Sequence, residues 1–211
     1  MNNEVLSCSV IDFIYHYFRK GTRPFQSLSV LSEEQAKSMM KSLFIPGSML
    51  WQRFGSPDWY LSLRRQVESE LYSQFKAKGG SPRQAYPIYF TVGRPKWAVD
   101  SGDPATIKHT AEIRVPFSLL RPQEVSLTYP DSMLSFILRD NKDHPEYNAE
   151  YHGKVFILEE MESLIKRDGL PVHDWRQDRP PHFSHYIEVQ VWSQAPLERY
   201  LKRHDTQGED R

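Results

Sequence analysis

Apolar residues recur at helical spacing in residues 32–44, near the start of the chain. The recurring positions are Ala36, Met39, Met40 and Leu43. Ser32 precedes this pattern and Gln35 lies three residues later, which is the spacing of a capping box. The spacing predicts a helix that begins after Ser32 and buries the apolar stripe.

A second and longer helical pattern covers residues 56–78. Its apolar face consists of Tyr60, Leu63, Val67, Leu71 and Phe75. Ser56 and Pro57 suit the first positions of a helix, and the glycines that follow residue 78 suit its end. Arg64 and Glu68 are spaced as a surface ion pair worth about a few tenths of a kcal/mol. Residues 10–19, which precede both helices, fit either a helix or a buried strand.

Polar and apolar residues alternate with a period of two through the later part of the chain, as they do in strands. The expected strands cover residues 86–93, 108–115, 124–129, 153–158 and 185–192. A turn at residues 130–132 leads into a short helix, and residues 159–167 predict another. Glu112 and Glu188 lie opposite the apolar side of their strands, which is typical of a solvated sheet face.

The order of these elements favours an α+β fold, because a helical first third is followed by strands with few helices among them. We expect a mostly antiparallel sheet packed by N-terminal helices, with one face covered. The chain of 211 residues fits a single domain. Within it we expect a helical part (1–80), a strand-rich part (81–203) and a frayed tail (204–211).

Composition narrows the classes of partner. The chain has 27 basic and 27 acidic residues, so it lacks the basic surface field on which nucleic-acid binding relies. Its apolar runs are too short to span a bilayer, and its single cysteine allows no internal disulfide. These features predict a soluble, cytoplasmic protein that binds neither membrane nor, strongly, nucleic acid. The absence of net repulsion between copies favours a homo-oligomer, with Trp175 and Trp192 as candidate surface residues.

Motifs that would identify common enzymes are absent. The chain has no P-loop, no dinucleotide-binding glycine motif, no H-E-x-x-H and no G-x-S-x-G. A catalytic site made of residues scattered along the sequence remains open.

Three groups of residues are candidates for chemistry. His173, His182 and His185 have spacing compatible with a metal ion, although loop histidines in ordinary hydrogen bonds also explain them. Tyr129, Asp131 and Ser132 form a candidate ligand site, with a proline turn and a helix cap as the alternative. His152 and Lys154 are candidate ligand-binding residues near a strand start, where a turn and an edge strand explain them equally.

Three short segments in the first 120 residues resemble the ADP-ribosyltransferase fold. They are Tyr15-His16-Tyr17, Tyr89-Phe90-Thr91 and Ala111-Glu112-Ile113. The resemblance implies that His16 contacts the ribose of NAD, Tyr89 stacks on the nicotinamide and Glu112 polarises the ribose 2′-hydroxyl. The serine-threonine-serine and paired-glutamate motifs of other branches of that superfamily are missing.

These observations lead to three expectations about function. The first is a domain that binds a ligand or partner without catalysis, with no particular cofactor indicated. The second is an NAD- or nucleotide-using transferase of the ADP-ribosyltransferase-like type, with His16, Tyr89 and Glu112 at its centre. The third is a metal-dependent hydrolase that uses His173, His182 and His185.

Overall fold

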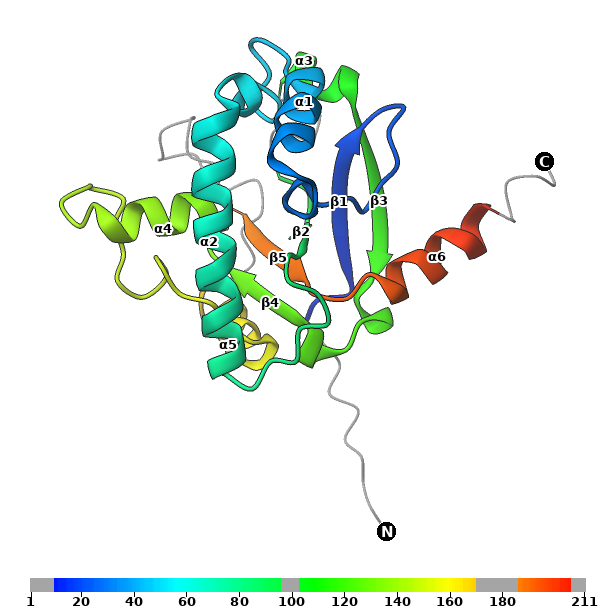
Figure 1. Cartoon of the computed structure of the whole chain (residues 1–211). Helices are drawn as coiled ribbons and strands as arrows, with labels where there is room; N and C mark the ends of the chain where they lie inside the picture. The colour runs from blue at the N-terminus through cyan, green and yellow to red at the C-terminus, as the bar shows by residue number, and fades with distance from the viewer. Residues whose placement is uncertain (1–9, 96–102, 170–185, 206–211) are drawn as a thin grey trace.

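A five-stranded sheet forms the centre of the computed structural model, which describes residues 10–95, 103–169 and 186–205 (Figure 1). The strand order is β3-β1-β2-β5-β4, and every neighbouring pair is antiparallel. The strands are β1 (Phe13–Arg19), β2 (Ile88–Val92), β3 (Thr110–Pro116), β4 (Val125–Thr128) and β5 (Ile187–Val191). This arrangement confirms the expected α+β fold with an antiparallel sheet.

Six α-helices accompany the sheet in the described residues. They are α1 (Glu33–Leu43), α2 (Pro57–Ala77), α3 (Pro104–His109), α4 (Ser132–Asp140), α5 (Leu158–Asp168) and α6 (Ala195–Asp205). Short 3-10 turns lie at η1 (Leu28–Val30), η2 (Gln52–Gly55), η4 (Phe117–Leu119) and η5 (Pro122–Glu124). None of the helices in this part of the chain is both long and apolar enough to cross a membrane.

Local sequence signals explain where the two N-terminal helices begin. Ser32 accepts a hydrogen bond from the backbone of Gln35, and the Gln35 side chain accepts one from the backbone of Ser32, so the expected capping box is present. Met39 departs from the expected stripe, because 38% of its surface is exposed. Pro57 starts α2, although Ser56 makes no side-chain capping bond there.

The first face of the sheet is apolar. Alternating residues of all five strands, such as Ile14, Phe90 and Val189, belong to the main hydrophobic core. Residues of α5 and α6, including Met161 and Leu197, pack into the same core. Burial of this face supplies the main hydrophobic stabilisation of the sheet.

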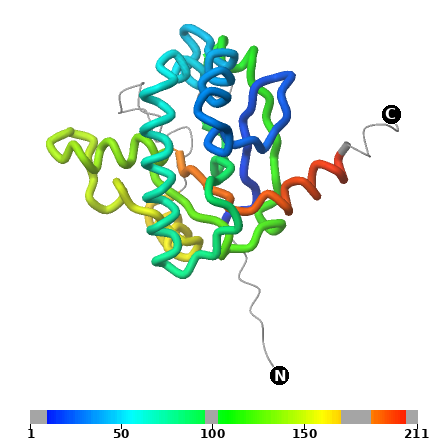
Figure 2. The backbone as a smooth tube through the Cα atoms, viewed as in Figure 1, coloured from blue at the N-terminus to red at the C-terminus, as the bar shows by residue number. Residues whose placement is uncertain are grey.

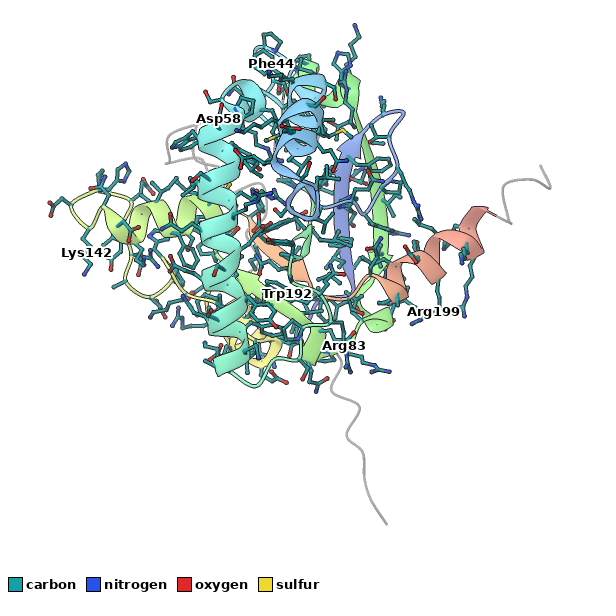
Figure 3. All side chains as sticks on the ribbon, in the orientation of Figure 1. Phe44, Asp58, Arg83, Lys142, Trp192 and Arg199 are labelled. Atoms are coloured by element: carbon teal, nitrogen blue, oxygen red, sulfur yellow. The ribbon has the colours of Figure 1, made fainter. Side chains whose placement is uncertain are left out.

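The second face is polar, and α1, α2 and α4 cover it. In Figure 1, α1 and α2 lie side by side in front of the sheet, and α4 projects on the side opposite α6, as Figure 2 also shows. Trp192, labelled in Figure 3, packs against Tyr72 and Phe75 of α2. Trp192 is therefore fully buried and cannot be the surface residue that we expected. The expectation of one covered face is also wrong, because helices lie on both.

Several element boundaries differ from the sequence expectation. Residues 10–19 contain a central strand, β1, so the N-terminal part is not purely helical. Residues 153–158 contribute one isolated bridge, Leu127–Phe156, instead of a strand. Helix α3 covers Lys108 and His109, where a strand was expected to start, and α6 was not anticipated.

Candidate functional site

The polar face of the sheet carries a row of facing side chains across four strands. Tyr15 pairs with Thr91, Thr91 with Glu188, and Glu188 with Thr128. Residues paired across antiparallel strands point to the same face, so these four form one row. Because helices cover the face, Glu188 is only 9% exposed, which contradicts the solvated position expected for it.

The next row is held by a closed hydrogen-bond network around Gln190. Its amide nitrogen donates to Thr128 Oγ1 and Glu188 Oε1, both at 3.0 Å. Its amide oxygen accepts from Ser126 Oγ at 2.9 Å, and Ser126 Oγ accepts from the indole N–H of Trp192. Satisfied buried networks of this kind fix side chains in one arrangement. Glu188 is therefore held in place from its own strand.

The larger of two adjoining cavities lies where β1 leaves β2. The register of β1 with β2 comprises Ile14–Val92 and Tyr15–Thr91, whereas its pairing with β3 continues to Arg19. Beyond Tyr15, side chains of β1 and β2 face a cavity of about 480 Å³. This volume lies in the range of about 300–1,000 Å³ that is usual for small-molecule sites.

The lining of the larger cavity combines cations with flat rings. Four arginines contribute to it, namely Arg19, Arg23, Arg53 and Arg64. Aromatic walls come from Phe25, Trp51, Phe54 and Tyr89. No described residue of this lining is an aspartate or glutamate. Arg23 and Arg64 pair with Glu198 and Glu68 outside the lining, so the basic character of the cavity comes from Arg19 and Arg53, which have no ion-pair partner within 4.0 Å among the described residues.

Two polar atoms at this lining have unmet hydrogen-bonding capacity. Ser27 is 7% exposed, and its Oγ has no hydrogen-bond partner among the described residues. Nη1 of Arg19 is likewise buried and unpartnered within the described part of the chain. A buried polar group without a partner costs about 1–3 kcal/mol. Both atoms belong to residues of the lining of the larger cavity.

His16 closes the base of the larger cavity and is held as a neutral imidazole. Its Nε2 accepts a hydrogen bond of 3.0 Å from the backbone N–H of Phe25, so its proton is on Nδ1, which donates to the carbonyl oxygen of Tyr89 at 2.8 Å. Burial lowers the pKa of His16 to about 4. Both ring nitrogens are therefore occupied by the backbone.

The smaller cavity, of about 90 Å³, shares part of its lining with the larger one and contains both carboxylates and arginines. It is lined by Asp131 and Glu188 together with Tyr15, Tyr60 and Tyr186. The two cavities share Tyr17, Arg53, Arg64 and Tyr89 in their linings. The two cavities together are called the cleft, and within it the described carboxylates line only the smaller cavity.

The N-terminus of α4 positions the two carboxylates. Asp131 Oδ1 accepts from the backbone of Leu134 at 3.0 Å and caps the helix, as its sequence position suggested. Glu188 Oε1 accepts from the backbone of Ser132 at 3.1 Å. Burial, with the nearby charge of Asp131, raises the pKa of Glu188 to about 7. Burial also raises the pKa of Asp131.

A buried ion pair on α2 supports the wall between the cavities. Arg64 Nε lies 3.0 Å from Glu68 Oε1, and the two side chains are 12% and 0% exposed. The expected surface pair is therefore a buried one. Tyr89 donates its hydroxyl to Glu68 at 3.0 Å, and the Arg64 guanidinium stacks 4.5 Å from the Tyr89 ring centroid. This network fixes the orientation of Tyr89.

The residues named by the family resemblance separate in the structure. His16 and Tyr89 line the larger cavity together. Glu112 lies outside both linings and forms a forked ion pair with Arg94 at 2.8 and 2.9 Å.

The other candidate residues from the sequence also lie at different places in the structure. Asp131 and Ser132 line the smaller cavity, whereas buried Tyr129 packs edge-on against Tyr151 at a separate small pocket. His152 Nδ1 accepts from the backbone of Asn148, and exposed Lys154 is also outside the cleft. The metal candidates His173, His182 and His185 lie outside the described residues. Within the part of the chain that the structure describes, no cluster of three or more potential ligands could hold a metal ion.

Sequence reasoning overlooked Ser27. Interleaved arginines and aromatic residues in the helical third, Arg19 and Arg53 among them, suit phosphate and base binding, but the sequence favoured core packing with a solvated charged face. Glu188 carried a weak signal, since an acid within a strongly alternating strand is unusual if both sheet faces are covered.

Comparison of the chain with protein-family models, with curated proteins and with solved structures finds no match.

Proposed function

We propose that this chain binds a small molecule that carries a phosphate-like anion and a planar ring. The larger cavity is its site, and the observation that carries the proposal is its lining, which joins arginines to aromatic walls and contains no aspartate or glutamate among the described residues. Two residues of this lining, Ser27 and Arg19, also carry a buried polar atom without a partner in the described structure, and such atoms are costly in a folded protein.

The chemistry of the lining supports this ligand class. Guanidinium groups bind phosphate oxygens through parallel N–H donors, and Arg53 has no ion-pair partner within 4.0 Å among the described residues. Tyr89 is half-buried and supplies the aromatic surface on which a base could stack, while Trp51 and Phe54, 4% and 3% exposed, back the aromatic wall of the cavity. A mononucleotide presents both features in one molecule.

Calorimetric titration with AMP, adenosine and inorganic phosphate tests the proposal. We expect AMP to bind more tightly than either fragment, because it engages both the arginines and the aromatic walls. Arg19→Gln should weaken AMP binding by about tenfold to a hundredfold, the usual effect of losing a charged hydrogen bond.

Arg121→Gln is the matched control for this loss of charge. Arg121 is 72% exposed and lies outside both linings, so its replacement should leave AMP affinity unchanged. If AMP does not bind, or if both variants weaken binding equally, the larger cavity is not a phosphate site.

A transferase of the ADP-ribosyltransferase-like type is the second candidate. It is favoured by the placement of His16 and Tyr89 at one cavity and by carboxylates in the adjoining one. The carboxylates there are Asp131 and Glu188, whereas Glu112 lies elsewhere. Release of nicotinamide from NAD by the purified chain would support this candidate, and its absence during prolonged incubation would refute it.

A further inference from the structure

We propose that Asp131 and Glu188 form an acid–base pair that holds one proton at neutral pH and exchanges it with the ligand in the cleft. The inference rests on the proposed function for the identity of the ligand. The two proposals concern different roles: the carboxyl pair transfers a proton, whereas the arginines of the larger cavity bind the anionic group of the ligand.

The geometry brings two carboxyl groups to one enclosed volume. Both line the smaller cavity, and each accepts a backbone N–H from the first turn of α4. In the described residues, neither has a cationic nitrogen within 4.0 Å. A buried and a half-buried carboxylate at one cavity, without a paired cation, cannot both ionise cheaply, so the pair retains one proton.

The groups that surround the pair are mostly uncharged. The titratable and charged groups that line the smaller cavity with it are Tyr15, Tyr17, Arg53, Tyr60, Arg64, Tyr89 and Tyr186. Arg53 is the cation whose charge favours ionisation of Asp131, while Arg64 is engaged by Glu68. The elevated pKa of both carboxyls agrees with this balance of burial, like charge and one distant cation.

A pair that holds one proton can act as an acid by giving up that proton, or as a base by accepting another. The protonated carboxyl transfers its proton to an oxygen or nitrogen of the ligand, which leaves both carboxylates ionised until water returns a proton. Efficient general acids and bases have a pKa near the working pH. The shared linings place a ligand in the larger cavity within reach of the pair through the region of Arg53 and Tyr89.

Infrared spectroscopy tests whether the proton is shared. Wild-type protein at pH 7 should show the C=O stretch of a protonated carboxyl, identified by its shift on labelling with carbon-13 glutamate and aspartate. Glu188→Gln should abolish the glutamate band, and Asp131→Asn should weaken it, because that change removes the like charge that adds to the effect of burial on Glu188. Glu124→Gln, at a buried carboxylate paired with Arg83, should leave the band unchanged.

The absence of the band in wild type, or a band of unchanged intensity in Asp131→Asn, would overturn the shared proton. Exchange with a ligand is measured by titrating AMP in two buffers of different ionisation enthalpy. Wild type should differ from Glu188→Gln by up to one proton per AMP bound, and this difference cancels any proton exchanged by AMP itself. Equal proton counts would overturn the acid–base role. If AMP does not bind, both the proposed function and the proton exchange with AMP are refuted. The infrared band still tests whether Asp131 and Glu188 share a proton.

Discussion

A single serine hydroxyl at the larger cavity links stability to binding. Ser27 Oγ is buried without a partner in the described structure, so Ser27→Ala removes a polar group whose burial is uncompensated. We expect the free energy of unfolding, measured with urea, to rise by about 1 kcal/mol. AMP affinity should fall in the same variant. Stability gained at the expense of binding is typical of functional positions.

Ser135→Ala provides the contrast for this prediction. Ser135 is also fully buried, but its Oγ accepts a hydrogen bond of 3.0 Å from the backbone of Gly153. Its replacement should lower stability by about 1–3 kcal/mol and leave AMP binding unchanged. If Ser27→Ala destabilises the chain as much as Ser135→Ala, Ser27 has a structural partner and not a ligand.

Phe25 shows a second departure from ordinary geometry at the same cavity. Its φ angle is +59°, a left-handed conformation that bulky residues rarely adopt. Its backbone N–H bonds to His16, and its ring packs against those of His16 and Phe90. Strained residues persist where surrounding contacts hold them, and they concentrate at binding sites. No local sequence signal marks Phe25 as such a residue.

At the scale of elements, the start of α1 depends on its capping box. Ser32→Ala removes the bond to the Gln35 backbone and should lower the free energy of unfolding by about 1 kcal/mol. Ser56→Ala is the matched control, since Ser56 stands at the N-cap of α2 without a side-chain bond. Chemical denaturation should show a clearly smaller loss for Ser56→Ala, and equal losses would contradict the assigned role of Ser32.

Local patterns predicted the elements whose signals lie within a few residues. The capping box at Ser32, the start of α2 at Pro57 and the cap of α4 by Asp131 are all present. The ambiguity of residues 10–19 could not be resolved locally, because β1 is a strand through its pairing with distant strands. Residues 153–158 have the composition of a strand but contribute only the bridge at Phe156.

The candidate site was less accessible from the sequence because it depends on which faces are covered. Alternation placed Glu188 correctly opposite the apolar side, yet alternation alone indicates solvent there. Burial of that face by α1, α2 and α4 turns the same residue into an enclosed acid. Similarly, the sequence favoured a solvated charged face for Arg19 and Arg53, which line one cavity because β1 separates from β2.

At the scale of the whole molecule, burial in a sheet covered on both sides shifts the pKa values of two groups in opposite ways, because it disfavours the charged form of each. The folded chain holds His16 neutral, with its pKa lowered from 6.5 to about 4 by burial. It also favours protonated Glu188, with its pKa raised from 4.5 to about 7 by burial and by Asp131. Between about pH 4.5 and 6.5 the unfolded state binds more protons at His16 and fewer at Glu188. The two contributions to the pH dependence of stability therefore oppose each other.

Single substitutions should separate the two contributions. Relative to wild type, Glu188→Gln should lose roughly 3 kcal/mol of stability as the pH falls from 7 to 4.5, because wild type gains from protonating Glu188 over this range. Relative to wild type, His16→Gln should gain a similar amount as the pH falls from 6.5 to 4, because only wild type must charge a histidine on unfolding. Urea denaturation at several pH values gives both differences.

The signs of these differences test the assignment more strongly than their sizes. Each substitution also removes hydrogen bonds of its own, but that loss contributes a constant offset and leaves the slope with pH intact. The double variant should therefore show a difference from wild type whose pH dependence largely cancels between pH 4.5 and 6.5. If the two single variants showed slopes of the same sign, then either His16 is not held neutral in the folded chain or Glu188 is not held protonated.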